Sequence, residues 1–169
     1  MDQGIAIIFI AIGVGISLVA FFAVVNILFG SMVIRIEEKS DESPGRSFFL
    51  GLLNTAFIAV LSLALWSIAE NSGISILAVP SLFLLALFAV GVILGGTALV
   101  RTIGKHLYPD REERTQMLWG GLITVLACVV PYIGWFLLLP YLLLRGFGAF
   151  LMTLTAAYRA RRAPAGETE

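Results

Sequence analysis

Residues 4 to 34 form an apolar run of 31 residues that contains no ionisable side chain. A helix needs about 20 such residues to cross a hydrocarbon core of about 30 Å. The run is longer than that, so we expect a helix that is tilted or that extends past the headgroups. A helix that is hydrophobic on all sides needs apolar surroundings on all sides. The chain is therefore predicted to be an integral membrane protein.

Composition supports this prediction and excludes some functions. Hydrophobic residues make up 59% of the 169 residues and charged residues only 13%, whereas an average soluble domain has about 25% charged residues. The formal net charge is zero, which argues against binding of nucleic acid, because phosphates require a basic surface. We expect the lipid bilayer to be the main partner and expect no nucleic-acid partner.

Three further apolar regions follow the first. The second, residues 48 to 69, is introduced by Ser43 and Pro44, which is typical of a helix start. The third reaches Val100. The last, residues 118 to 158, is about twice the length of one span and is interrupted by prolines and a glycine. The predicted helices cover approximately residues 4–36, 45–70, 75–104, 111–130 and 134–158.

These helices predict an all-α fold, a polytopic transmembrane helical bundle. It comprises residues 1–158, with three full spans followed by a Pro/Gly-broken helical hairpin that turns at Pro131 and Gly134. Whether residues 118–130 cross the membrane fully or form a re-entrant segment stays open. Residues 159–169 are predicted to be a disordered tail, first basic and then acidic.

The distribution of Lys and Arg predicts the topology, because cytoplasmic loops collect these residues. Ten of the eleven lie in the first loop, the third loop or the tail: Arg35, Lys39, Arg46, Arg101, Lys105, Arg111, Arg114, Arg159, Arg161 and Arg162. A cytoplasmic tail requires an even number of passages after Gln116, which a hairpin provides and one kinked crossing does not. We therefore expect a multi-pass protein of the plasma (inner) membrane with its N-terminus outside and its C-terminus in the cytoplasm.

Three polar residues within the apolar regions are candidates for a site. Arg145 is the eleventh basic residue, and a mid-bilayer arginine costs about 2.5–3.5 kcal/mol on insertion scales. It is expected either to bind an anionic headgroup or substrate anion, or to extend towards an interface. Asn26 and Asn54 lie at similar depths and are expected to hydrogen-bond to each other, as structural contacts more than as ion ligands.

Two local patterns predict packing and a helix start. Gly91 and Gly95 form a small-xxx-small pattern, extended by Gly96, at which another helix can approach closely. The pattern fits packing within the monomer and dimerisation equally well. Asp110 followed by Glu113 resembles a capping box and predicts a helix from residue 111.

The sequence contains no pattern typical of catalysis or of metal binding. His106 is the only histidine and Cys128 the only cysteine, so neither has partners at metal-ligand spacing. No nucleophile elbow, phosphate-binding loop or H-E-x-x-H helix is present. We therefore expect no enzymatic activity, no catalytic residues, no metal site and no cofactor.

The segment from Gly120 to Trp135, with its Pro-Tyr-Ile-Gly stretch, and the piece Arg145-Gly-Phe-Gly-Ala149 resemble the closing part of the membrane region of bacterial polymer-forming, bactofilin-like proteins. The preceding helices are similar in number and spacing. Those proteins also carry a β-helical domain that this chain lacks, and Arg145 replaces an expected apolar residue. The resemblance implies a bacterial membrane module without known enzymatic activity, and it transfers no site residues.

Two functions remain as hypotheses. The first is a non-catalytic anchor, scaffold or regulatory subunit that acts through its inner loops and helix faces on a protein partner or on a second copy. The second is a small transporter or channel component with an anion or lipid path near Arg145, because interrupted helices often build such paths. The sequence contains no convincing inverted repeat, which disfavours the second hypothesis.

Overall fold

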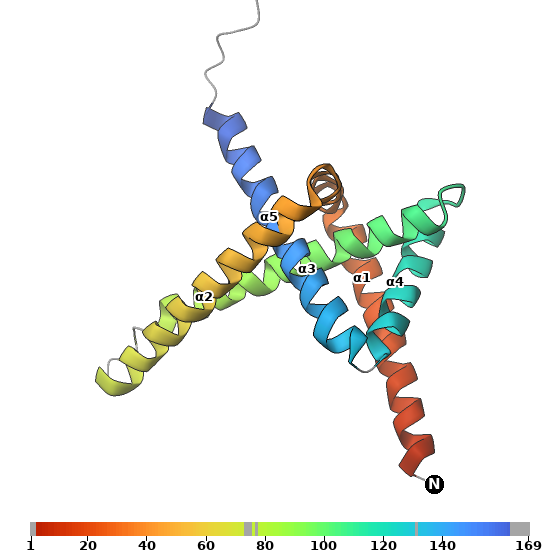
Figure 1. The fold of residues 1–169 in the computed structure, drawn as a ribbon, viewed down its shortest axis with the longest axis horizontal. Helices are drawn as coiled ribbons and strands as arrows, with labels where there is room; N and C mark the ends of the chain where they lie inside the picture. Colours follow the sequence, from red (N-terminus) through yellow and green to blue (C-terminus); the bar gives the residue numbers. More distant parts are fainter. Residues whose placement is uncertain (1–2, 73–75, 77, 131, 163–169) are drawn as a thin grey trace, which may run out of the picture.

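The computed structural model describes residues 3–72, 76, 78–130 and 132–162, and these residues are almost entirely helical. The elements are α1 (Gln3–Glu42), α2 (Pro44–Ser72), α3 (Ala78–Leu107), α4 (Glu113–Val129), the π-helical segment η2 (Ile133–Leu138) and α5 (Leu139–Arg162) (Figure 1). The predicted all-α class and the predicted order of helices are confirmed. Pro44 is the first residue of α2, as expected.

Four of the helices are long and apolar enough to cross a membrane. The qualifying segments are Ile12–Glu42, Pro44–Asn71, Ala78–Leu107 and Gly134–Arg159. Helix α4 has 17 residues and is about 25 Å long at 1.5 Å per residue, so it is shorter than the hydrocarbon core. Many large apolar side chains on the four long helices are exposed. The fold is therefore compatible with an integral membrane protein.

The helix ends fall into two groups (Figure 1). The start of α1, the end of α2, the start of α3 and the turn between α4 and η2 lie in the lower part of the view. The turn between α1 and α2, the connection between α3 and α4 and the end of α5 lie in the upper part. We call this second group, residues 35–46, 101–114 and 159–162, the charged end. The segment α4–η2–α5 forms the predicted hairpin, because it returns the chain to the charged end.

The hairpin turns through an irregular segment. Tyr132 has a φ of 67° and a ψ of −63°, a conformation that is rare and strained for a residue with a side chain. A Cβ atom on Gly134 would lie 2.5 Å from the carbonyl oxygen of Ala127, so a glycine is needed there. Leu139 donates its backbone N–H to the carbonyl of Gly134. This bond spans five residues, which explains why a π-helical turn opens the predicted helix 134–158.

Helix α1 continues to Glu42, six residues beyond the predicted end at residue 36. Its backbone leaves helical geometry at Phe29, where φ is −120° and ψ is 26°. Beyond this kink, residues 33, 36, 37 and 40 are buried, and they follow the i, i+3, i+4, i+7 spacing of one helix face. The charges after Ile34 therefore mark the edge of the apolar layer, while the helix itself continues.

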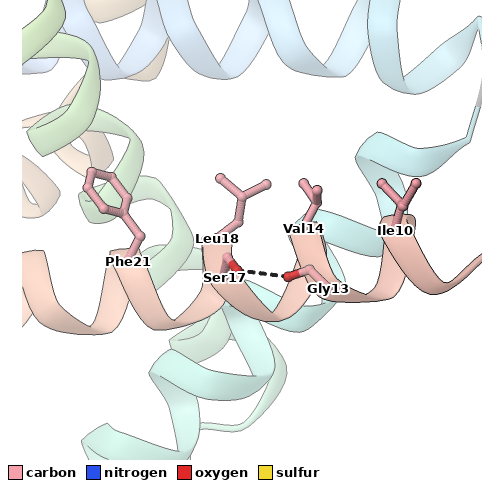
Figure 2. A pocket seen from close by; sticks show the side chains of 6 residues that line it. All are labelled: Ile10, Gly13, Val14, Ser17, Leu18 and Phe21. Carbon is pink, nitrogen blue, oxygen red and sulfur yellow. Dashed lines mark hydrogen bonds between the residues drawn. The ribbon is translucent and has the colours of Figure 1, made fainter.

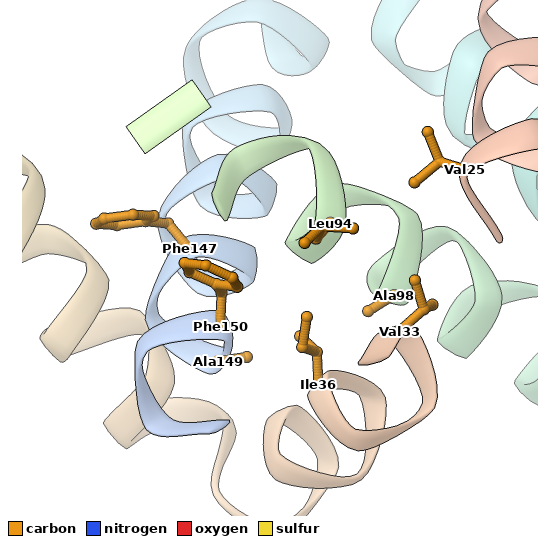
Figure 3. Close-up of a cluster of buried hydrophobic side chains, with 8 residues drawn as sticks. All are labelled: Val25, Val33, Ile36, Leu94, Ala98, Phe147, Ala149 and Phe150. Atoms are coloured by element: carbon orange, nitrogen blue, oxygen red, sulfur yellow. The ribbon is translucent and has the colours of Figure 1, made fainter. Parts of the chain in front are cut away.

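The core lies between the last part of α1, the second half of α3 and the middle of α5 (Figure 3). Its buried members are Val25, Val33, Ile36, Leu94, Ala98, Phe147, Ala149 and Phe150. The ring of Phe147 also contacts that of Phe88 edge to face, with centroids 4.9 Å apart. These residues come from three helices, so the core joins elements that are far apart in the sequence.

Glycines allow the packed helices to touch backbone to backbone. A methyl group on Gly95 would overlap the backbone of Gly146, and one on Gly146 would crowd Gly95, where α3 meets α5. Helices α3 and α4 also touch at glycines, because a methyl group on Gly120 would overlap the carbonyl of Val100 and one on Gly104 would overlap the carbonyl of Gln116. Helices α2 and α5 also meet at glycines, because a methyl group on Gly51 would overlap the carbonyl of Leu144. Close approach of this kind is a main source of helix association in membranes.

Candidate functional site

Arg145 lies near the start of α5 and contacts the last turn of α1. Its Nε donates to Ser40 Oγ at 3.0 Å, and its Nη2 donates to the carbonyl oxygen of Ser40 at 3.3 Å. The same Nη2 pairs with Asp41 Oδ1 at 3.4 Å, and Nη1 donates to Tyr141 Oη at 3.3 Å. The Arg145 side chain is 17% exposed. We call Arg145, Ser40, Asp41 and Tyr141 the α1–α5 clamp.

This arrangement is suited to fixing the end of a helix. The last four carbonyl groups of a helix have no partner within it, and a cation near that end is favourable. Arg145 supplies both a donor and the positive charge to Ser40 and Asp41. Tyr141 also stacks on Phe48 of α2, with ring centroids 5.5 Å apart. The guanidinium is therefore occupied by protein groups that hold three helices together.

A second cluster surrounds Glu37, which is only 3% exposed. Its Oε2 accepts from Arg101 Nε at 2.7 Å, and its Oε1 pairs with Lys105 Nζ at 3.4 Å. Arg101 Nη2 also donates to Glu113 Oε1 at 2.8 Å. A buried carboxylate is tolerated only when it is paired and hydrogen-bonded. These four residues, the α1–α3–α4 clamp, therefore join three helices at the charged end.

Local sequence accounts for the α1–α3–α4 clamp. Arg101 and Lys105 are four residues apart and so lie on one face of α3. Glu113 is the first residue of α4, where a negative charge is favourable. The predicted capping box is wrong, since α4 begins at Glu113 after Glu112, which forms no side-chain cap. The carboxylate of Glu113 is bound by Arg101 instead.

The two asparagines do not form the expected hydrogen bond with each other. Asn54 donates its side-chain amide to the carbonyl of Leu50 in its own helix, at 2.8 Å. The side-chain oxygen of Asn26 is buried and has no hydrogen-bond partner within the described part of the chain. Helix α2 packs mainly against α5 and α3, and has little contact with α1. The two residues therefore do not form one polar site.

The predicted packing glycines contact α5 and α1 of the same chain. A Cβ on Gly91 would lie 2.7 Å from the ring of Phe147, and Gly95 meets the backbone of Gly146. A Cβ on Gly96 would lie 3.7 Å from the ring of Phe22 in α1. Of the two predicted turn residues, Gly134 lies at the hairpin turn, and Pro131 falls outside the described residues.

An apolar groove of about 770 Å³ lies between the first half of α1, α3, α4 and the η2–α5 segment. Its walls include Leu18, Phe22, Val92 and Leu142. The only hydroxyl group among its lining residues belongs to Thr124, which donates it to the carbonyl of Gly120 at 2.7 Å. Apart from this hydroxyl, the thiol of Cys128 and the indole of Trp135, the lining side chains are hydrocarbon, so the groove suits an apolar occupant.

A shallower hollow of about 670 Å³ lies along one face of α1 (Figure 2). Ile10, Val14, Leu18 and Phe21 point to the same side of the helix in this view. Ser17, the one polar side chain there, donates its hydroxyl to the carbonyl of Gly13 at 2.8 Å. Because the Ser17 hydroxyl is bonded within the helix, this face of α1 presents only apolar side chains to a neighbouring molecule.

Sequence reasoning missed both clamps. In the sequence Glu37 stands among Glu38, Asp41 and Glu42 and does not differ from them in type, although only Glu37 is deeply buried. The available signal was that Val33, Ile36, Glu37 and Ser40 share one helix face. Among the residues that the structure describes, no group of three or more His, Cys, Asp or Glu side chains could hold a metal ion.

No protein-family model matches the chain, and neither a curated protein nor a solved structure is significantly similar to it. The class is therefore defined by the structure alone. It is an all-helical bundle in which four helices could cross a membrane and two polar clamps fix the charged end.

Proposed function

We propose that the chain is an integral membrane protein that acts as a non-catalytic anchor, scaffold or regulatory subunit. The observation that carries this proposal is the difference between two sets of charged side chains at the charged end. Ionic side chains in the two clamps bind other helices of the same chain. Others stay exposed and form no ion pair within the described residues, and Asp110, Arg111, Glu112 and Arg114 lie next to one another. We call these four residues the mixed-charge segment. Because the two clamps hold the surrounding helices together, this exposed segment suits docking of a protein.

We further propose that the charged end faces the cytoplasm from the plasma (inner) membrane of a bacterium. Ten basic residues lie within its residues 35–46, 101–114 and 159–162, in helix ends and in the α3–α4 connection. The eleventh, Arg145, contacts Ser40 and Asp41 at the same end. Positive charge therefore accumulates at one end of the bundle, and such ends stay on the cytoplasmic side. The N-terminus is then outside and the C-terminus inside.

The transporter or channel hypothesis has less support. Its central residue, Arg145, has five N–H groups and makes four contacts with Ser40, Asp41 and Tyr141. Little donor capacity is left for a passing anion. Arg145 is also not among the residues that line the apolar groove. The resemblance to bactofilin-like membrane regions agrees with a structural role and stays a prediction.

Affinity purification in a mild detergent, followed by mass spectrometry, tests the docking role. We expect a specific protein to co-purify with the wild type and with Arg145→Leu. It should be lost from the triple variant Asp110→Ala, Arg111→Ala and Arg114→Ala, because these exposed side chains form the mixed-charge segment.

Helical content and monodispersity should be the same in all three preparations, which controls for misfolding. Recovery of the same partner from the triple variant would place docking elsewhere on the chain. Anion flux in proteoliposomes that is abolished by Arg145→Leu would overturn the proposal in favour of transport.

A further inference from the structure

We propose that Arg35, Arg46, Arg159 and Arg162 form a binding surface for the phosphate headgroups of anionic phospholipids. We call these four residues the arginine surface. The inference rests on the proposed membrane location and goes beyond the proposed docking role. It assigns a lipid to one part of the charged end and leaves the mixed-charge segment to a protein.

Helix α5 brings the arginine surface together. The hydroxyl of Thr153 lies 3.5 Å from the carbonyl oxygen of Arg35, so this part of α5 lies beside the end of α1. One turn earlier, Gly148 packs against the carbonyl of Ser47, the residue after Arg46. The same helix then continues to Arg159 and Arg162. Arg35 and Arg46 therefore lie beside the middle of α5, and Arg159 and Arg162 lie in its last turns.

These arginines are exposed and form no ion pair within the described part of the protein. Arg162 lies over the ring of Tyr158, with its guanidinium carbon 4.6 Å from the ring centroid. This stacking leaves the N–H groups at the rim of the guanidinium free to donate. A planar guanidinium with free donors matches a phosphate group well.

Within the part of the chain that the structure describes, the acidic residues nearby do not neutralise the arginine surface. Glu37 pairs with Arg101 and Lys105, Asp41 with Arg145, and Glu42 with Lys39. In the segment from residue 35 to 46, only Glu38 is an acidic residue without an ion pair. The α3–α4 connection differs, because Asp110 and Glu112 offset Arg111 and Arg114 there. Unbalanced positive charge is therefore concentrated around α5.

Apolar neighbours indicate a lipid rather than an acidic protein segment. Ile34 is exposed beside Arg35, Phe49 one turn after Arg46, and Tyr158 beside Arg159. An arginine next to an exposed apolar side chain lies at the boundary between water and hydrocarbon, which is where lipid phosphates lie. Basic residues beside the ends of membrane helices are attracted to anionic lipids.

Native mass spectrometry of the detergent-solubilised protein tests this proposal directly. The wild type would be titrated with phosphatidylglycerol and with phosphatidylcholine of the same acyl chains. The test variant is Arg159→Gln/Arg162→Gln, and the matched control is Arg111→Gln/Arg114→Gln, which removes the same charge from exposed sites. A third variant, Arg159→Lys/Arg162→Lys, keeps the charge.

We expect the wild type to prefer phosphatidylglycerol. The test variant should bind it about thirtyfold more weakly, which corresponds to about 1 kcal/mol for each arginine at the surface. The control variant should change by less than about threefold. The lysine variant should bind between the wild type and the test variant, since it keeps the charge but lacks the planar guanidinium.

An equal loss in the test and control variants, or no preference for phosphatidylglycerol in the wild type, would overturn the inference. Binding of a polyglutamate peptide that requires Arg159 and Arg162, without a lipid preference, would assign the surface to an acidic protein instead. The docking proposal fails separately, through retention of the co-purified protein when the mixed-charge segment is removed.

Discussion

The two parts of α1, before and after the kink at Phe29, differ in composition and in surroundings: the first is almost entirely apolar, whereas residues 30–42 contain six charged side chains. Before the kink, Ile16 is 66% and Ile27 80% exposed, whereas Ile36, after it, is fully buried. Glu37 and Ser40, beside Ile36, belong to the two clamps. Hydrophobicity alone therefore does not identify the packed part of this helix. The spacing of buried residues and their polar neighbours does.

The difference follows from the physics of helix association in lipid. Hydrocarbon solvates an exposed isoleucine about as well as a protein core does, so helices are held by close packing and polar contacts. The polar contacts of the two clamps lie at the charged end, and the reciprocal pair Gly95 and Gly146 packs α3 against α5 next to Arg145. Exposed side chains in the first part of α1, such as Ile16 and Ile27, are therefore expected to face lipid and to tolerate substitution, whereas Val25 is packed in the core.

The largest effect is expected from Gly95→Leu. The leucine side chain would overlap the backbone of Gly146. Two helices in backbone contact cannot make room for it, and such overpacking costs about 3 kcal/mol or more. Size-exclusion chromatography in detergent should yield no monodisperse protein. Gly13→Leu is the control, because nothing lies within 4 Å of a Cβ there, and it should behave as the wild type. Similar behaviour of both variants would contradict the packed contact.

Glu37→Gln should be the next most damaging change. It removes the charge that Arg101 and Lys105 share. Loss of one partner from a buried pair costs about 3–5 kcal/mol, and we expect about 3 kcal/mol here because Arg101 keeps Glu113. SDS titration in mixed micelles would measure the free energy of unfolding. Glu38→Gln, one residue along and exposed, should change it by less than about 0.5 kcal/mol.

Ile36→Ala and Ile16→Ala compare the two parts of α1 with the same substitution. Ile36 is fully buried in the core, and truncation of a buried isoleucine costs about 2–5 kcal/mol. We expect about 2 kcal/mol, since the hydrophobic part of that cost is small in lipid. Ile16→Ala should stay within about 0.5 kcal/mol. Equal values in the same titration would mean that both parts of α1 are packed alike.

Arg145→Leu should have the smallest effect of the four. It removes the donors to Ser40 and Asp41, at about 1.5–3 kcal/mol for charged hydrogen bonds, and the inserted apolar side chain offsets part of this loss. We expect about 1–1.5 kcal/mol in the same titration. Arg111→Leu, at an exposed position without an ion pair, is the control. A gain in stability for Arg145→Leu would remove the argument for the α1–α5 clamp.

Much of the fold could be predicted from the sequence, because apolar runs and prolines fix the helices of a membrane protein. The hairpin was predictable from Pro131 and Gly134 together with the basic residues of the tail, which require an even number of passages. The clamps were not, because Glu37 and Arg101 are 64 residues apart and their pairing depends on how α1 crosses α3. The position of Arg145 close to the charged end could not be predicted either, since distance along the chain does not reveal that α5 runs beside the end of α1. Gly104 could not be predicted as a packing glycine either, because Val100 and Tyr108, four residues away on either side, are not small.

The central claim is that the whole charged end lies on one side of a membrane. In a Cys128→Ala background, single cysteines replacing Arg46, Arg111, Arg162 and Asn71 would be treated in sealed inverted vesicles with a maleimide that cannot cross the membrane. We predict that the first three react and that the cysteine at position 71 reacts only after the vesicles are opened. Reaction at positions 162 and 71 from the same side would contradict the hairpin and the proposed topology.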